Sequence, residues 1–215
     1  MLTLNFLYIL SITILSTIVL MYIMIKRKWI LANPTNRGLH EKSVPSSGGI
    51  AIFVGYLISY LFIVNDILSE NVDLVKVNDM IIIFSLFLIC FLGLLDDKFK
   101  LSKFIRFSSQ IIISVVIVSM FNYTTITTLV YIGLIVYFIN SYNFMDGIDS
   151  LAVSQAIFMI LSLLFIIGEI MISPIVLLSI LAVFLFYNTS LSKIFLGNSG
   201  SYFLGLYIII FFTIL

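Results

Sequence analysis

The stretch that decides the fold is DMIIIFSLFLICFLGLLDD, residues 79–97. Between Asp79 and Asp96 every residue is apolar except one serine and one glycine. At about 1.5 Å per residue, a helix over these residues is about as long as the hydrocarbon core of a bilayer is thick. The apolar residues form a continuous run instead of alternating, which favours a membrane helix over a barrel strand. We therefore predict a transmembrane helix over Asp79–Leu95, with two adjacent carboxylates directly at its end.

The composition of the whole chain agrees with a membrane protein. Of its 215 residues, 62% are hydrophobic and 10% are charged, whereas about a quarter of the residues of a globular domain are charged. The net charge of +1 gives no general attraction to nucleic acid, so we expect no nucleic-acid partner. The first apolar stretch has no charged start and no small-residue cleavage site, which favours a retained span over a leader peptide. The fold class that we predict is an all-α, polytopic membrane helix bundle.

Eight apolar stretches predict eight transmembrane helices in a single domain over residues 1–215. They are Leu4–Ile25, Gly48–Val64, Asp79–Leu95, Phe107–Phe121, Thr125–Ser141, Leu151–Gly168, Pro174–Asn188 and Ser201–Leu215.

The basic residues predict the orientation of these spans, because loops on the inner side of a membrane are rich in Lys and Arg. Lys26, Arg27 and Lys28 follow the first span, which places the N-terminus on the periplasmic side. With that orientation only Lys76 lies outside, and ten of the eleven basic residues lie inside. The inner loops are then 26–49, 96–106, 142–150 and 189–200. We expect the functional residues in these loops, facing the cytoplasm.

The strongest polar motif is Asn140-Ser-Tyr-Asn143-Phe-Met-Asp146-Gly147-Ile-Asp149-Ser150. Asn140, Asn143 and Asp146 recur every third residue and so share one face of a helix. Amides and carboxylates at the edge of a membrane are costly unless they hold a ligand or one another. The alternative to a binding site is a cluster of hydrogen bonds between helices.

Two further motifs lie at span ends. Asp96 and Asp97 are neighbouring acids that a divalent cation would stabilise, although a plain solvated helix end is the alternative. The turn Phe195-Leu-Gly197-Asn198-Ser199-Gly200-Ser201 offers backbone N–H groups at a helix start, which suits a phosphate, although a tight interhelical turn is the alternative. In loop 26–49, Arg37 and Lys42 are placed to reach a diphosphate, and His40 is the single histidine.

In combination, these motifs resemble one family. The double aspartate, the Asn-x-x-Asn-x-x-Asp-Gly-x-Asp motif and the Phe-x-Gly-x-x-Gly-Ser turn are similar, in order and in membrane side, to those of the polyprenyl-phosphate N-acetylhexosamine-1-phosphate transferases (glycosyltransferase family 4). The amino-acid sequences of loop 26–49 and of residues 143–149 most resemble those of the bacterial branch that starts O-antigen, capsule or similar surface polysaccharides. The resemblance covers nearly the whole chain.

The resemblance implies an activity and its partners. Such enzymes transfer an N-acetylamino-sugar 1-phosphate from a UDP-sugar to polyprenyl (undecaprenyl) phosphate in the bacterial inner membrane, and UMP is released. They use Mg²⁺, or in its place Mn²⁺, and often form homodimers. The catalytic residues would be Asp96, Asp97 and Asp149. The metal ligands would be Asp96, Asp97, Asp146 and Asn198. The substrate-binding residues would be Arg37, His40, Asn140, Asn143, Asp146, Gly200 and Ser201.

This sequence departs from the family in three places. Asn198 stands where the family has an aspartate, Ser150 stands where it has a glycine, and the chain stops at Leu215, where the family continues with further spans and a cytoplasmic loop. The alternative function is therefore a truncated or degenerate relative that binds lipid phosphate or nucleotide without catalysis. A transporter is disfavoured because its ionisable residues would lie near the bilayer midplane.

Overall fold

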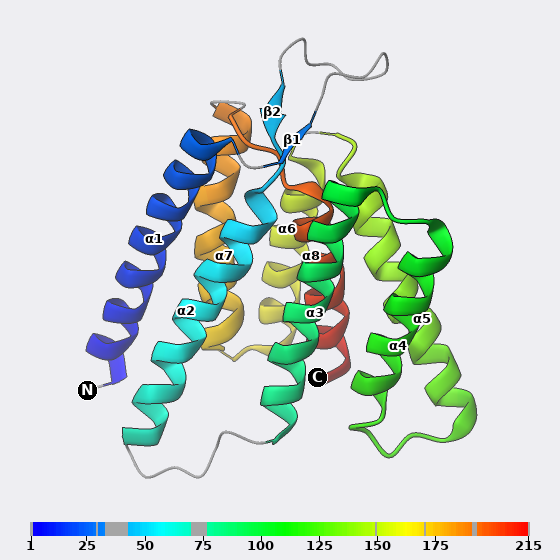
Figure 1. Ribbon diagram of the computed structural model, residues 1–215. Helices are drawn as coiled ribbons and strands as arrows, with labels where there is room; N and C mark the ends of the chain where they lie inside the picture. Colours follow the sequence, from blue (N-terminus) through cyan, green and yellow to red (C-terminus); the bar gives the residue numbers. More distant parts are fainter. Residues whose placement is uncertain are drawn as a thin grey trace.

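In the computed structural model (Figure 1), an all-α bundle carries one small β-ribbon at one end. The structure describes residues 2–28, 30–32, 43–69, 77–148, 150–169, 171–190 and 193–214. The helices in these ranges are α1 (Leu2–Arg27), α2 (Gly48–Ser69), α3 (Val77–Phe99), α4 (Lys103–Val118), α5 (Thr125–Met145), α6 (Leu151–Ile167), α7 (Ile172–Leu185) and α8 (Gly197–Ile214). The strands β1 (Leu31–Ala32) and β2 (Val44–Pro45) pair antiparallel, with Leu31 opposite Pro45.

All eight predicted spans correspond to helices, which confirms the all-α class. Four helical stretches are long and apolar enough to cross a membrane, judged by length and composition: Asn5–Arg27, Asn78–Phe99, Thr125–Met145 and Ile172–Thr189. Gly48–Val64 and Leu151–Ile167 are shorter apolar helices. That all eight helices cross the membrane, and that the N-terminus is periplasmic, remain predictions.

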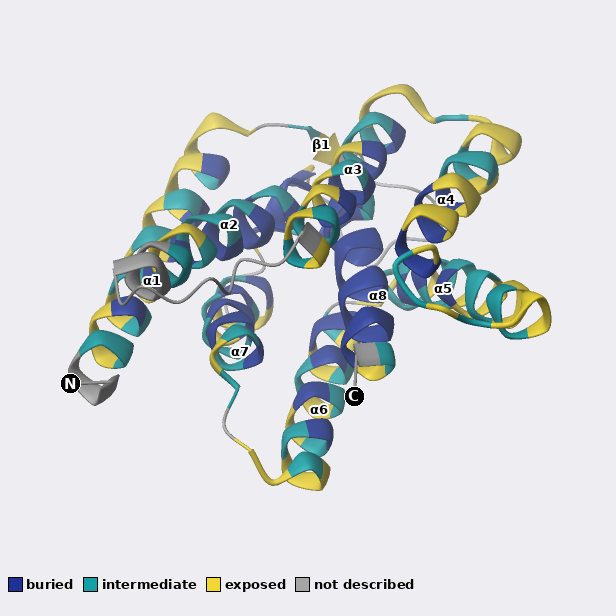
Figure 2. Ribbon diagram, turned by 90° about the horizontal axis from the view of Figure 1, so that it is seen from below, coloured by how far each residue is buried: buried dark blue, intermediate teal, exposed yellow. Residues whose placement is uncertain are grey.

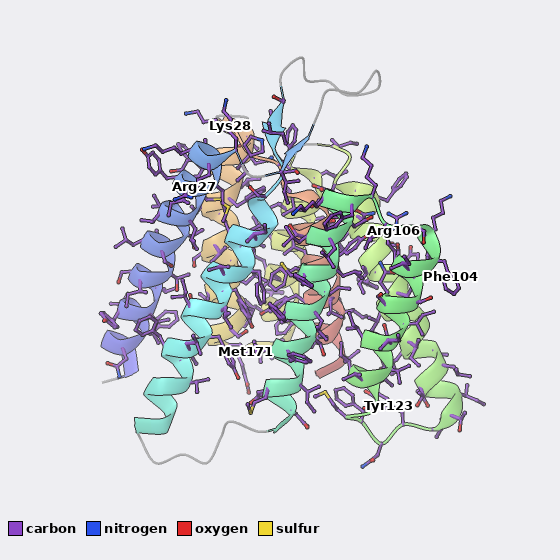
Figure 3. All side chains as sticks on the ribbon, viewed as in Figure 1. Arg27, Lys28, Phe104, Arg106, Tyr123 and Met171 are labelled. Atoms are coloured by element: carbon purple, nitrogen blue, oxygen red, sulfur yellow. The ribbon has the colours of Figure 1, made fainter. Side chains whose placement is uncertain are left out.

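The helices run up and down between two ends of the bundle (Figure 1). Arg27, Lys28 and Arg106 lie at the end that carries the β-ribbon, which we call the basic end, and Tyr123 and Met171 lie at the opposite end (Figure 3). This separation agrees with the grouping of basic residues that the sequence predicts.

Helix α8 forms the centre of the bundle. Figure 2, a view along the bundle, shows it dark blue and surrounded by other helices, and every residue from Ser199 to Phe211 is buried. The outer surface is apolar: Phe144 and Phe165 are each 88% exposed. Exposed apolar surface of this extent is typical of a protein that faces lipid.

Small residues let α8 approach its neighbours closely at the basic end. A Cβ atom at Gly93 of α3 would overlap the carbonyl oxygen of Asn198, and one at Gly49 of α2 would overlap the backbone of Gly200. Close backbone approach through small residues is the usual way in which membrane helices pack. The starts of α2 and α8 and the end of α3 therefore meet in one place.

A π-helix, Phe186–Ser190, extends α7 and is not predicted from the sequence. Such helices are rare and often mark functional sites.

Candidate active site at the basic end

Asp96, in the last turn of α3, is the most enclosed acid of the site. It is only 4% exposed, and its Oδ2 accepts three hydrogen bonds. Nη1 of Arg106 donates at 3.1 Å, Nδ2 of Asn198 at 2.9 Å and the hydroxyl of Tyr202 at 2.9 Å. A buried carboxylate is costly unless it is paired and hydrogen-bonded. Here α4 supplies the opposite charge and α8 supplies two neutral donors.

Asp97 lies against the start of α8. The backbone N–H of Asn198 donates to its Oδ1 at 3.1 Å, and that of Ser199 donates to its Oδ2 at 3.4 Å. The first N–H groups of a helix have no partner within the helix, and the helix dipole favours a negative charge beside them. Asp97 thus caps α8 from another helix. Two of the N–H groups that the sequence offers to a phosphate are bonded to this carboxylate.

Gly197 makes this contact possible. Its φ of +72° lies in the left-handed region, which favours glycine. A Cβ atom here would overlap the carbonyl oxygen of Ser46 and would lie 2.8 Å from Oδ2 of Asp97. The segment before it is fixed by backbone hydrogen bonds, from the N–H of Phe195 to the oxygen of Pro45 and from the N–H of Gly48 to the oxygen of Phe195.

The end of α5 forms a second wall of the site. Asn140 donates through Nδ2 to Oε1 of Gln110 at 2.7 Å, and Asn143 accepts at Oδ1 from the hydroxyl of Ser201 at 3.3 Å. The shared face that the sequence predicts therefore contacts α4 through Asn140 and α8 through Asn143. For Asn140 this is the interhelical hydrogen bond that the sequence leaves open as the alternative, and its role in substrate binding remains a prediction.

Three predicted site residues, Arg37, His40 and Asp149, lie outside the described residues. Asp146 ends α5 as its C-cap residue. Gly200 contributes backbone that packs closely against α2. The roles of these residues remain predictions.

Residues that the sequence reasoning missed are Tyr202, Gln110 and Asn188. Tyr202 is one helical turn after Asn198, and Gln110 is one turn after Arg106. Asn188, in the π-helix, is 3% exposed, accepts from the hydroxyl of Ser150 at 2.9 Å and donates to the oxygen of Ile194 at 2.9 Å. It joins the loop after α5 to the segment before α8. For Gln110 and Asn188 the available signal is a polar side chain within or at the end of an apolar stretch, whereas Tyr202 gives no such signal.

The residues present fit a magnesium ion only in part. Within the described ranges, no group of three or more His, Cys, Asp or Glu side chains is arranged to hold a metal ion. Mg²⁺, however, is often held by one or two carboxylates together with the phosphates of a substrate. Asp97 suits that role because each of its oxygens accepts one backbone N–H and keeps acceptor capacity. Oδ2 of Asp96 already has three donors, and the amide nitrogen of Asn198 faces Asp96.

Comparison with known proteins identifies the family. The family model for glycosyl transferase family 4 matches residues 80–215. A Bacillus subtilis (strain 168) protein, described as "Probable undecaprenyl-phosphate N-acetylglucosaminyl 1-phosphate transferase", is 32% identical over 193 residues, or 80% of this chain and 51% of that protein. The undecaprenyl-phosphate alpha-N-acetylglucosaminyl 1-phosphate transferase of Thermotoga maritima is 31% identical over 85% of this chain and 56% of its own. The decaprenyl-phosphate N-acetylglucosaminephosphotransferase of Mycobacterium tuberculosis (strain ATCC 25618 / H37Rv) is 26% identical over 82% of this chain and 51% of its own.

The chain thus spans about half the length of these three relatives. The bacterial relatives and the apolar helices together indicate a multi-pass membrane protein. The match to more than half of the chain shows that it belongs to glycosyl transferase family 4.

Proposed function

We propose that the protein transfers an N-acetylamino-sugar 1-phosphate from a UDP-sugar to polyprenyl phosphate, with release of UMP. The observation that carries the proposal is the meeting of two adjacent carboxylates, an arginine and the start of a helix at one end of a membrane bundle. A lipid phosphate reaches such a place from the bilayer, and a nucleotide sugar reaches it from the adjoining water. The product would start a cell-envelope polysaccharide, such as an O-antigen, on the cytoplasmic side of the inner membrane.

In the proposed reaction an oxygen of the lipid phosphate attacks the β-phosphorus of the UDP-sugar. The bond from that phosphorus to the oxygen bridging to UMP breaks, and UMP leaves with the electron pair. Catalysis of phosphoryl transfer is almost entirely positioning and electrostatic stabilisation. A phosphate monoester has a second pKa of about 6 and is largely doubly charged at neutral pH, so the approach of two anions is the main obstacle.

Among the described basic residues, Arg106 is placed to reduce that repulsion because it contacts Asp96 directly. Its Nη1 holds Asp96, while its Nε is buried and has no hydrogen-bond partner among the described residues. A guanidinium offers several donors in a fixed plane, which suits phosphate oxygens. We propose that Arg106 contacts the lipid phosphate or the diphosphate through the donors that Asp96 leaves free.

Magnesium, or manganese in its place, would supply further charge neutralisation at the diphosphate when bound. Asp97 would hold it, with Asp146 as the second predicted ligand. Asp96 would orient Arg106 and the start of α8. Asn143 and Ser201 would line the nucleotide side of the site.

The test is the exchange of radiolabelled UMP into UDP-GlcNAc and related UDP-amino sugars in membranes supplied with undecaprenyl phosphate. We expect Mg²⁺-dependent exchange that is lost in Asp96→Asn. Asp79→Asn, the same change near the opposite end of α3, is the matched control and should retain exchange. Folded wild-type protein that shows no exchange with any sugar would refute catalysis by this chain. Binding of UDP-sugar in that case would instead support the non-catalytic alternative, which the amide at residue 198 favours.

A further inference from the structure

The side chain and backbone of one residue join the two carboxylates of the site. The side-chain Nδ2 of Asn198 donates to Oδ2 of Asp96 at 2.9 Å, and its backbone N–H donates to Oδ1 of Asp97 at 3.1 Å. Asn198 therefore bridges two neighbouring acids with two N–H donors. A divalent cation is one group that the sequence predicts in this bridging role.

Tyr202 completes the arrangement from the same helix face, because residues four apart on a helix are neighbours. Its hydroxyl is the third donor to Oδ2 of Asp96, and the residue itself is fully buried. An ionised carboxylate only accepts hydrogen bonds, so the amide of Asn198 must present its nitrogen to Asp96. With Arg106, Asp96 has one opposite charge and two neutral donors at a single oxygen.

We propose that Asn198, with Tyr202 as a further donor to Asp96, takes the place of a resident divalent cation between Asp96 and Asp97. The site is then assembled by protein groups alone, before any metal ion binds, and neither Asp96 nor Asn198 is a metal ligand in the substrate-free protein. Only the corollary that the metal ion arrives with the diphosphate rests on the proposed function. The assembly itself does not.

A carboxylate at residue 198 would make the assembly of the site depend on a metal ion. The substitution Asn198→Asp would remove the Nδ2 donor and would place a third negative charge beside Asp96 and Asp97. Like charges this close destabilise one another, and a divalent cation would relieve the repulsion. The variant should therefore be less stable and should acquire a dependence on Mg²⁺ that the wild-type protein lacks.

The experiment compares the melting temperatures of wild-type, Asn198→Asp and Asn122→Asp proteins in one detergent, with EDTA or with Mg²⁺ at matched ionic strength. Asn122, in the exposed turn between α4 and α5, is the control for an added carboxylate away from the site. We expect Mg²⁺ to leave wild type and Asn122→Asp unchanged. Asn198→Asp should melt about 3 °C or more lower in EDTA and recover with Mg²⁺. A saturable rise of the wild-type melting temperature with Mg²⁺, or an Asn198→Asp protein indifferent to Mg²⁺, would overturn the proposal.

If Asn198→Asp does not fold, the binding of Mn²⁺ to the wild-type protein decides the question. We expect the electron paramagnetic resonance signal of free Mn²⁺ to persist when nucleotide-free protein is added in equimolar amount. Loss of that signal through tight binding of one ion per chain would refute the proposal. The UMP exchange assay reports separately on the proposed function: exchange by a protein that binds Mn²⁺ alone would overturn this inference and leave the transferase standing.

Discussion

Arg106 is the residue through which α4 reaches the double aspartate. Its guanidinium lies 3.1 Å from Oδ2 of Asp96, and its side chain is 27% exposed. A hydrogen bond between charged groups contributes more than one between neutral groups, and without Arg106 the buried Asp96 would keep two neutral donors and no opposite charge.

Replacement of Arg106 by Gln should therefore destabilise the protein by about 1.5–3 kcal/mol. Arg106→Lys keeps the charge and should lose less. Thermal unfolding in lipid nanodiscs measures both changes. In the double variant Asp96→Asn with Arg106→Gln, the losses should add up to less than the sum of the single changes, because both act on one interaction. Fully additive losses would show that the two groups do not depend on each other.

Ser150 holds a backbone conformation that is unusual for serine. Its φ of +65° is left-handed, and its hydroxyl donates to Asn188 at 2.9 Å. The conformational cost is of order 1–3 kcal/mol, and a typical hydrogen bond contributes about 1 kcal/mol.

Two substitutions separate these effects. Ser150→Ala loses the hydrogen bond and keeps the strained backbone, so stability should fall by about 1 kcal/mol. Ser150→Gly loses the same bond but relieves the strain, so its stability should equal or exceed that of wild type. The melting temperatures of the two variants, measured side by side, check this order. An alanine variant as stable as the glycine variant would contradict it.

At the level of whole elements, the close approach of α3 and α8 at Gly93 fixes the position of the site. Gly93→Ala should destabilise the protein by about 1–3 kcal/mol, the usual cost of overpacking, and should lower UMP exchange. Gly133→Ala in α5 is the matched control. Its new methyl group meets nothing within 4 Å, and alanine is favoured over glycine in a helix. If the two substitutions changed stability and UMP exchange equally, the structure would relieve the predicted clash at Gly93 at little cost in free energy.

The sequence predicts the helices well because apolar length is a local property. Their ends are less predictable: α4 begins at Lys103 and not at residue 107, because Ser102 caps it by accepting from the N–H of Ile105 at 3.3 Å. The charges on Lys103 and Arg106 resemble those of a loop, yet they lie on the first turn of a helix.

The candidate site is predictable only where its polar residues form motifs. Asp96, Asp97 and Asn198 belong to such motifs, and the structure brings them together. Tyr202 lies in an apolar run, where an aromatic residue is ordinarily core packing. Tyr202 faces Asp96, which lies 106 positions earlier in the chain. This contact depends on how α8 is rotated against α3. No local pattern carries that information.

On the scale of the molecule, the separation of the two ends predicts opposite exposure across the membrane. Lys103→Cys lies at the basic end and Asn122→Cys at the opposite end, and both positions are exposed. In right-side-out vesicles, a membrane-impermeant thiol reagent should label Asn122→Cys at once and Lys103→Cys only after permeabilisation. The wild-type protein is the control because its single cysteine, Cys90, is buried. Labelling of both variants from one side would show that α4, which is only about 24 Å long, does not cross the bilayer.

The central position of α8 has a consequence for biosynthesis. Asp97 is separated from the N–H of Asn198 by 101 positions along the chain, and at about 5–20 residues per second the ribosome needs about 5–20 s to make that stretch. During this interval α3 is already made, while the helix that donates hydrogen bonds to both of its acids has not yet been synthesised. The two carboxylates can stay hydrated until then, because we expect the end of α3 at the boundary between membrane and water. Helix α8 both fills the core and links the two acids, so the candidate site cannot form until α8 is inserted.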